Sequence, residues 1–190
     1  MLYSVFTLGT MKTPIFEKGE GRMIKKIYFD MDGVLADFDR GIREFCGMDA
    51  VSQDYGKKPG MDTLMWERAS KIPHFYDQLE LMPGVKEMFD AVYNRYQDRC
   101  EILTGIPKPH RGMIGSAEDK TAWVRRLLSR DIVVHTVFKE QKPQFCFGRD
   151  CILIDDLQRN IDAWEKTGGT GILHRSSADT LQILKDLNIL

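Results

Sequence analysis

The chain has 190 residues, with 27 basic and 28 acidic side chains. This length predicts one domain, and 43% apolar with 29% charged residues indicates a globular rather than a disordered protein. A formal net charge of −1 argues against a nucleic-acid polymer as partner, and the lack of an apolar run of about 18 residues argues against a membrane span.

The first 22 residues stand apart from the rest of the chain. They contain a short apolar stretch at positions 2–8, but neither the basic region nor the small-residue cleavage site of a signal peptide. A charged, glycine-containing segment at 16–22 is typical of a linker, and Met23 begins the regular pattern. We therefore expect residues 1–22 to be an appendage that could add one edge strand.

Five short apolar runs predict the strands of one parallel sheet. They cover residues 27–29, 100–103, 132–138, 151–154 and 171–174. Amphipathic stretches between them predict helices at 85–96, 116–128, 160–166 and 178–187. Ser116 is the expected N-cap of the second of these helices. Strands that alternate with helices predict an α/β fold, a three-layer Rossmann-like parallel sheet with helices on both faces.

One region interrupts this alternation after the first strand. Helical patterns at 41–46 and 62–71 flank a glycine- and lysine-rich stretch at 56–60, and nothing there resembles a core strand. An insertion of this size predicts a small helical cap above the sheet. The expected division is an appendage at 1–22, a core formed by 23–39 and 82–190, and a helical cap at 40–81.

The cysteines bear on the redox environment. None of the four forms a C-x-x-C pair, and no histidine stands at ligand spacing beside them. They are Cys46, Cys100, Cys146 and Cys151. At this chain length and cysteine density, zinc ligands and a disulfide framework are both disfavoured. We expect reduced, mostly buried thiols in a cytoplasmic protein.

Two carboxylates, Asp30 and Asp32, directly follow the first predicted strand. Parallel α/β sheets bind ligands at the carboxyl ends of their strands, and Gly33 turns the chain at this point. Two acids this close repel each other unless a cation or a shared proton neutralises them. By itself, the pair could equally be an ordinary acidic turn.

Three further polar features stand at the same expected edge of the sheet. They are Thr104 and Gly105 after the second strand, Lys139 and Lys142 before the fourth, and Asp155 and Asp156 after it. Each has a plain alternative, because such residues also cap helices or remain solvated. Their joint occurrence at one edge predicts a functional site.

Together these segments resemble the four motifs of the haloacid-dehalogenase superfamily of phosphohydrolases. The motif positions are 29–34, 103–105, Lys142 and 153–156, and the resemblance covers residues 25 to about 175. Within the superfamily, residues 32–38, 81–85 and 153–156 are most similar to the 5'(3')-deoxyribonucleotidases, whose small cap also follows the first motif. The resemblance implies a Mg²⁺-dependent phosphomonoesterase for nucleoside 5'-monophosphates, with deoxyribonucleotides as the favoured substrates.

The resemblance also implies roles for the acids. Asp30 would attack phosphorus and form an aspartyl-phosphate, and Asp32 would serve first as acid and then as base. Mg²⁺ would be held by the Asp30 carboxylate, the Asp32 carbonyl and one of Asp155 and Asp156. Because dehalogenases of the superfamily lack an acid at the position of Asp32, its presence favours phosphate esters as substrates. Phosphotransferases and mutases share this acid, so they stay open as alternatives.

The remaining motif residues would contact the transferred phosphate. Thr104, with neighbouring backbone amides that include Gly105, would hold its non-bridging oxygens. A lysine would stabilise the charge on the transferring group. We prefer Lys142 to Lys139 because Lys142 begins the segment that leads into the fourth strand, although the family spacing varies.

Aromatic residues of the cap are candidates for contact with a base. Phe38 aligns with an aromatic residue that lies against the nucleobase in the deoxyribonucleotidases, and Phe75 and Tyr76 fall near a second aromatic cluster of that family. Packing between cap and core is the alternative, which we favour for Phe75 and Tyr76 and leave open for Phe38. The three tryptophans are expected in the core: Trp66, Trp123 and Trp164.

Several matters stay open at the level of sequence. For Lys108, His110 and Arg111 a solvated loop is favoured over contact with the substrate's phosphate or sugar. The partner is expected to be a small phosphate ester, and a homodimer is an open alternative. A phosphatase for another metabolite, such as a sugar phosphate, would share the same motifs. A non-catalytic nucleotide-binding domain would be expected to carry damaged motifs, whereas Asp30 and Asp32 are both present.

Overall fold

The computed structural model describes residues 23–51 and 60–190. Five strands form one sheet in the order β3-β2-β1-β4-β5, and every neighbouring pair is parallel. The strands are β1 (Lys26–Phe29), β2 (Cys100–Gly105), β3 (Val133–Val137), β4 (Cys151–Asp155) and β5 (Thr170–Leu173). All five lie at the apolar runs, so the predicted fold class is confirmed. The expected appendage and residues 56–59 lie outside the described residues.

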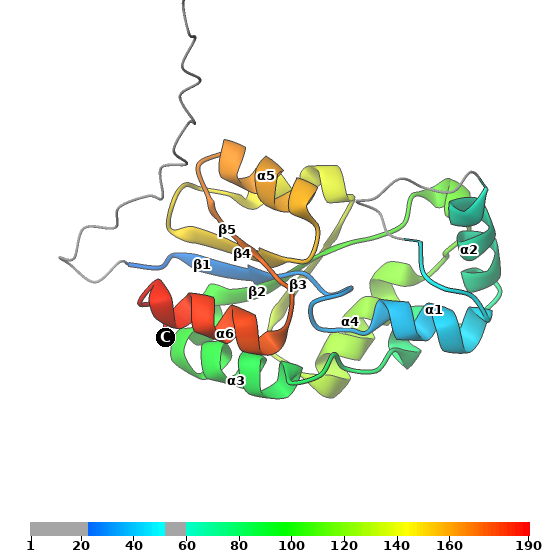
Figure 1. Ribbon diagram of the computed structural model, residues 1–190, viewed down its shortest axis with the longest axis horizontal. Coiled ribbons are helices and arrows are strands. Elements are labelled where there is room, and N and C mark those ends of the chain that lie inside the picture. The colour runs from blue at the N-terminus through cyan, green and yellow to red at the C-terminus, as the bar shows by residue number, and fades with distance from the viewer. Residues whose placement is uncertain (1–22, 52–59) are drawn as a thin grey trace, which may run out of the picture.

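Helices cover both faces of this sheet (Figure 1). The helices are α1 (Phe38–Cys46), α2 (Met61–Ala69), α3 (Val85–Tyr96), α4 (Ser116–Leu127), α5 (Gln158–Lys166) and α6 (Ser177–Asp186). Short 3₁₀ turns are η1 (Phe75–Gln78), η2 (Gln97–Arg99), η3 (Pro109–Arg111) and η4 (Lys139–Phe145). The prediction for Ser116 was wrong, because Gly115 is the N-cap residue and the Ser116 hydroxyl donates backward to the carbonyl of Met113.

The alternation of side chains along the strands builds two hydrophobic layers. On β1, Ile27 and Phe29 join the larger cluster with α3, α4 and α6, whereas Tyr28 points to a smaller cluster under α5. Figure 1 shows α3 and α6 on one side of the sheet and α5 on the other. Trp123 and Trp164 are fully buried in the two clusters, as expected. The side-chain period of two residues therefore determines which helix each strand residue meets.

The cap begins where β1 ends. Residues 31–37 form a tight turn in which the carbonyl of Met31 accepts from the amides of Leu35 and Ala36, both at 2.8 Å. Ala36 also forms an antiparallel bridge with Leu81, so the entry to the cap pairs with its exit. Helices α1 and α2 then lie beyond the carboxyl ends of the strands (Figure 1). The cap boundaries at 40 and 81 stay a prediction, although α1 itself begins earlier, at Phe38.

The thiols agree with the sequence-based expectation. All four cysteines are free, and three of them are buried while Cys146 is partly exposed. In the segments that the structure describes, no helix combines the length and the apolar character needed to cross a membrane.

Candidate active site

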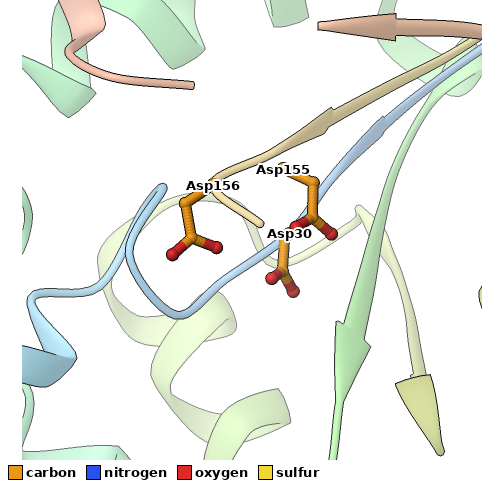
Figure 2. A group of neighbouring side chains, drawn as sticks. All are labelled: Asp30, Asp155 and Asp156. Carbon is orange, nitrogen blue, oxygen red and sulfur yellow. The ribbon is translucent and has the colours of Figure 1, made fainter. Parts of the chain in front are cut away.

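The acidic residues meet at the carboxyl ends of two central strands. Asp30 follows β1, and its amide donates to the carbonyl of Ile154 on β4 at 2.9 Å. Asp155 ends β4, and Asp156 comes directly after it. The three carboxylates lie side by side in Figure 2. The connections after β1 and β4 run to opposite sides of the sheet, which is the position where open α/β sheets bind their ligands.

The three carboxylates could hold one cation. One oxygen each from Asp30, Asp155 and Asp156 lies within 4.8 Å of the others. Both oxygens of Asp155 already accept hydrogen bonds, from Lys142, Asn160 and the Leu157 amide. Asp156 accepts none from the described residues, and burial together with the charges of Asp30 and Asp155 raises the pKa of Asp156 to about 8. The donor set therefore fits a hard divalent cation such as Mg²⁺, with Asp156 offering an unused carboxylate.

Gly33 makes room for Asp156. Its φ of 76° lies in the left-handed region, and a Cβ at this position would stand 2.5 Å from Oδ2 of Asp156. Glycine is therefore required both by the backbone conformation and by the close approach of the carboxylate. The turn that the sequence predicts at Asp32 and Gly33 therefore also leaves space for the carboxylate of Asp156.

Lys142 is the cation closest to the nucleophile candidate. Its ammonium lies 2.9 Å from Oδ1 of Asp30 and 2.6 Å from Oδ2 of Asp155, and its side chain is 2% exposed. Burial by itself lowers the pKa of Lys142, but Asp155 and Asp30 outweigh this effect and raise it above the ordinary value. Lys139 also lines the cavity, and a Cβ built on Gly105 would stand 3.7 Å from the Cβ of Lys139. The geometry thus favours Lys142 over Lys139 as the motif lysine.

Asp32 has a different cationic partner. Its Oδ2 lies 2.7 Å from the ammonium of Lys120, a fully buried residue of α4, which also donates to Thr104 Oγ1 at 3.0 Å. Asp32 Oδ1 is buried and has no hydrogen-bond partner in the described segments. Burial raises the pKa of Asp32 more than Lys120 lowers it. Oδ1 is therefore the oxygen of this carboxyl that no described group engages.

Lys120 was missed in the sequence analysis, although the sequence contains its signal. It stands three and four residues before Trp123 and Val124, on the apolar face of α4. A lysine on such a face has to find a carboxylate, because a buried ammonium without a partner is costly. Thr104 also contacts Lys120 and is fully buried, so its predicted contact with phosphate stays a prediction.

A cavity of about 590 Å³ opens above these residues. Its floor includes Asp30, Asp32 and Lys142, and Gly105 lines one wall. Phe38, Trp66 and Tyr76 form an aromatic wall on the cap side. The Phe38 ring is 5.8 Å from Trp66 and 6.3 Å from Tyr76 between centroids, stacked on the latter. The Lys120 ammonium lies 4.3 Å from the centre of the Tyr76 ring. Lys120 therefore contacts both the aromatic wall and Asp32.

The favoured packing role agrees with the position of Phe75, whereas Tyr76 and Trp66 also line the cavity. Phe75 is 1% exposed and packs behind Phe38 and Tyr76, so the structure does not bring it to the cavity wall. Tyr76 was expected to serve packing, and it is buried but also lines the cavity. Trp66 is buried at 6% exposure as expected and lines the cavity too.

The loop after β2 was expected to be solvated, and for Arg111 this was wrong. Its side chain is only 18% exposed and lies 3.2 Å from Oδ2 of Asp62 on the cap. Its guanidinium also lies 4.4 Å from the centre of the Trp66 ring. Lys108 is half exposed and pairs with Glu140 at 3.2 Å. The sequence did not reveal the contact of Arg111 because Asp62 and Trp66 belong to an inserted cap.

Comparison with solved structures identifies the fold. A haloacid-dehalogenase-superfamily hydrolase from Ehrlichia chaffeensis matches with a TM-score of 0.57 at 13% identity, covering 89% of this chain and 100% of that one. L-2-haloacid dehalogenase from Xanthobacter autotrophicus matches with a TM-score of 0.50 at 14% identity, covering 88% and 85%. These matches show that the chain has the haloacid-dehalogenase fold.

Sequence comparison narrows this class. No protein-family model matches the chain. A protein of Vibrio phage KVP40, described as a "Putative 5'(3')-deoxyribonucleotidase", is 31% identical over 140 residues, which is 70% of this chain and 67% of that protein. The chain therefore belongs to the 5'(3')-deoxyribonucleotidase family within the haloacid-dehalogenase superfamily, and it is a phosphatase.

Proposed function

We propose that the protein is a Mg²⁺-dependent 5'-nucleotidase that hydrolyses deoxyribonucleoside monophosphates. The observation that carries this proposal is the pair of adjacent carboxylates with separate partners. Asp30 lies against Lys142 beside two further acids, whereas Asp32 lies against Lys120 and keeps one oxygen unpaired. Covalent phosphoryl transfer needs this division between a charged nucleophile and a protonated acid.

The reaction has two steps on this chain. In the first, an oxygen of Asp30 attacks phosphorus, the ester P–O bond breaks, and the leaving oxygen takes the proton of Asp32. In the second, Asp32 removes a proton from water, the water oxygen attacks phosphorus, and the Asp30–phosphorus bond breaks to release phosphate. The Lys142 ammonium stabilises charge on the transferring group.

Lys120 acts as a positioning residue in this scheme. It holds Oδ2 of Asp32 and bonds Thr104, so it fixes the direction in which Oδ1 faces the leaving group. Burial raises the pKa of Asp32 despite Lys120, which favours the protonated carboxyl that the first step needs.

Mg²⁺ would be held by the carboxylates of Asp30 and Asp156 and by the carbonyl of Asp32. When bound, it supplies positive charge that reduces the repulsion between Asp30 and the substrate phosphate. Asp155 would orient Lys142 and remain bonded to Asn160.

The aromatic wall supports a nucleotide as the substrate. A planar base can stack against Phe38, Trp66 and Tyr76 while the phosphate reaches Asp30 on the floor of the same cavity. A sugar phosphate would occupy the acidic floor of the cavity but would place no ring against the aromatic wall. For this reason the nucleotide is the preferred substrate class.

Phosphate release from ribo- and deoxyribonucleoside 5'- and 3'-monophosphates and from sugar phosphates tests the proposal. We expect turnover that needs Mg²⁺, is strongest on deoxynucleotides and is lost in Asp30→Asn. Turnover confined to sugar phosphates would contradict the substrate, and normal release by Asp30→Asn would contradict the covalent mechanism. Nucleotide binding without turnover in Mg²⁺ would favour a binding domain instead.

A further inference from the structure

Three residues connect the cap to the loop after β2 at the edge of the cavity. The Trp66 indole Nε1 donates to Oδ1 of Asp62 at 3.1 Å, and Arg111 donates to Oδ2 of the same carboxylate at 3.2 Å. The Arg111 guanidinium also lies over the Trp66 ring, 4.4 Å from its centre. We call this set of Asp62, Trp66 and Arg111 the Trp66 clamp.

The clamp holds its members more firmly than a surface ion pair would. Trp66 is 6% exposed, and the side chains of Arg111 and Asp62 are 18% and 22% exposed. Because water is largely excluded, both the ion pair and the cation–π contact are strengthened. A Cβ built on the next residue of the loop, Gly112, would stand 3.5 Å from the Cβ of Ser70 at the end of α2, so the loop backbone also lies close to the cap helix.

The clamp determines the position of one part of the cavity wall. Trp66 and Arg111 both line the cavity, and the Phe38 ring lies 5.8 Å from the indole. Trp66 belongs to α2, whereas Asp30 and Lys142 belong to the core. Arg111 is therefore one of the contacts, together with Phe38, through which the core meets the indole.

We propose that Arg111 is a positioning residue that fixes Trp66 against the core and thereby sets the affinity for the aromatic part of the substrate. The inference rests on the proposed function, because it assigns the base to the wall that contains Trp66. Without Arg111, the indole loses the cation on its face and Asp62 loses its contact with the guanidinium. The phosphate site on the core keeps its geometry, so the chemical step is unchanged.

The test compares two substrates that differ only in the base, thymidine 5'-monophosphate and 2-deoxyribose 5-phosphate. For Arg111→Met we expect kcat/KM on the nucleotide to fall about five- to thirtyfold, the range that a partly desolvated cation–π contact and an ion pair supply. The loss should appear in KM with kcat preserved, and kcat/KM on the base-free substrate should change by less than about twofold. Arg111→Lys should recover part of the loss, because it keeps the positive charge.

A matched control stands three residues earlier on the same loop. Lys108→Met removes one positive charge and the pair with Glu140 at the cavity wall without removing a contact of Trp66, so the ratio of the two kcat/KM values should stay within about twofold of the wild type. The position of the indole is followed separately by ¹⁹F NMR of 5-fluorotryptophan protein, with the Trp66 line assigned from Trp66→Phe. This line should shift in Arg111→Met and stay in place in Lys108→Met.

The outcomes separate the two proposals. Wild-type protein without turnover of the nucleotide would defeat the proposed function. Turnover by the wild type with an equal loss on both substrates in Arg111→Met would defeat only the role of Arg111, since the loop would then act on the phosphate site. An unchanged Trp66 line, or a kcat/KM on the nucleotide within twofold of the wild type, would overturn it as well.

Discussion

Replacing Lys142 by methionine removes the only cation that contacts both Asp30 and Asp155 among the described residues. The ammonium lies 2.9 and 2.6 Å from their oxygens and is 2% exposed. At an effective dielectric constant of about 20, each contact contributes roughly 6 kcal/mol of Coulomb energy, and burial of the charges opposes most of it. Deleting one member of a buried pair leaves the other charges unpaired, so we expect a loss of about 3–5 kcal/mol in unfolding free energy.

Urea unfolding at pH 7 in chelator measures this loss. Adding Asp155→Asn to Lys142→Met should recover part of it, because the second change removes one unpaired carboxylate while the bonds to Asn160 can persist. Lys139→Met is the matched control on the same turn, and we expect an effect below about 0.5 kcal/mol. A Lys142→Met protein within about 1 kcal/mol of the wild type, or a double variant without recovery, would refute the reasoning.

Two further measurements distinguish charge from packing at this position. The pKa of Lys142 is raised, so its contribution is fully present below the ordinary lysine value and is lost only as pH rises through the higher folded value. The loss in Lys142→Met should therefore still be present at about pH 9. Mg²⁺ should stabilise Lys142→Met more than the wild type, because the site becomes more negative. Phosphatase activity should fall more than about a hundredfold.

Three other substitutions test separate features. In chelator, wild-type stability should fall as pH rises from about 4 to about 8, because the folded pKa of Asp156 is raised to about 8. Asp156→Asn should make this slope shallower, although the raised pKa values of Asp32 and Asp155 still contribute to it, and it should weaken Mg²⁺ binding in calorimetry. Gly33→Ala should destabilise the fold in urea by about 1–3 kcal/mol more than Gly168→Ala, since both have positive φ but only Gly33 places a Cβ against Asp156. The pKa of His74 is raised by its hydrogen bond to Asp119. The contribution of His74 to stability should therefore be present below about pH 6.5 and be lost as pH rises through the higher folded pKa. His74→Asn should remove this pH dependence in thermal unfolding.

The sheet and its acidic edge could be predicted from sequence because they depend on local patterns. Short buried runs such as the one ending at Asp155 are fully apolar, since both faces of a parallel strand are covered. The carboxyl ends of such strands must converge, so acids that follow two different runs were expected to meet. Asp30 and Asp155 do meet, beside Lys142, the lysine preferred from sequence.

Contacts between the cap and the core could not be predicted in the same way. Arg111 follows β2, whereas its partners Asp62 and Trp66 stand in an insertion whose orientation no strand register determines. Lys120 was closer to prediction, because it occupies the apolar face of a helix that the sequence did identify. Its partner Asp32 lies 88 residues away, so only the packed structure reveals why the lysine is buried.

The distribution of cations explains why the site suits a metal-assisted reaction. Lys142 forms ion pairs with Asp30 and Asp155, and Lys120 forms one with Asp32. No described residue donates a hydrogen bond to Asp156. A third lysine would neutralise this last carboxylate permanently and close the site to a divalent cation. Burial beside Asp30 and Asp155 raises the pKa of Asp156 and weakens the empty protein, and a bound cation would oppose both effects. The same unpaired charge therefore makes cation binding favourable next to the nucleophile candidate, where the phosphate has to be accommodated.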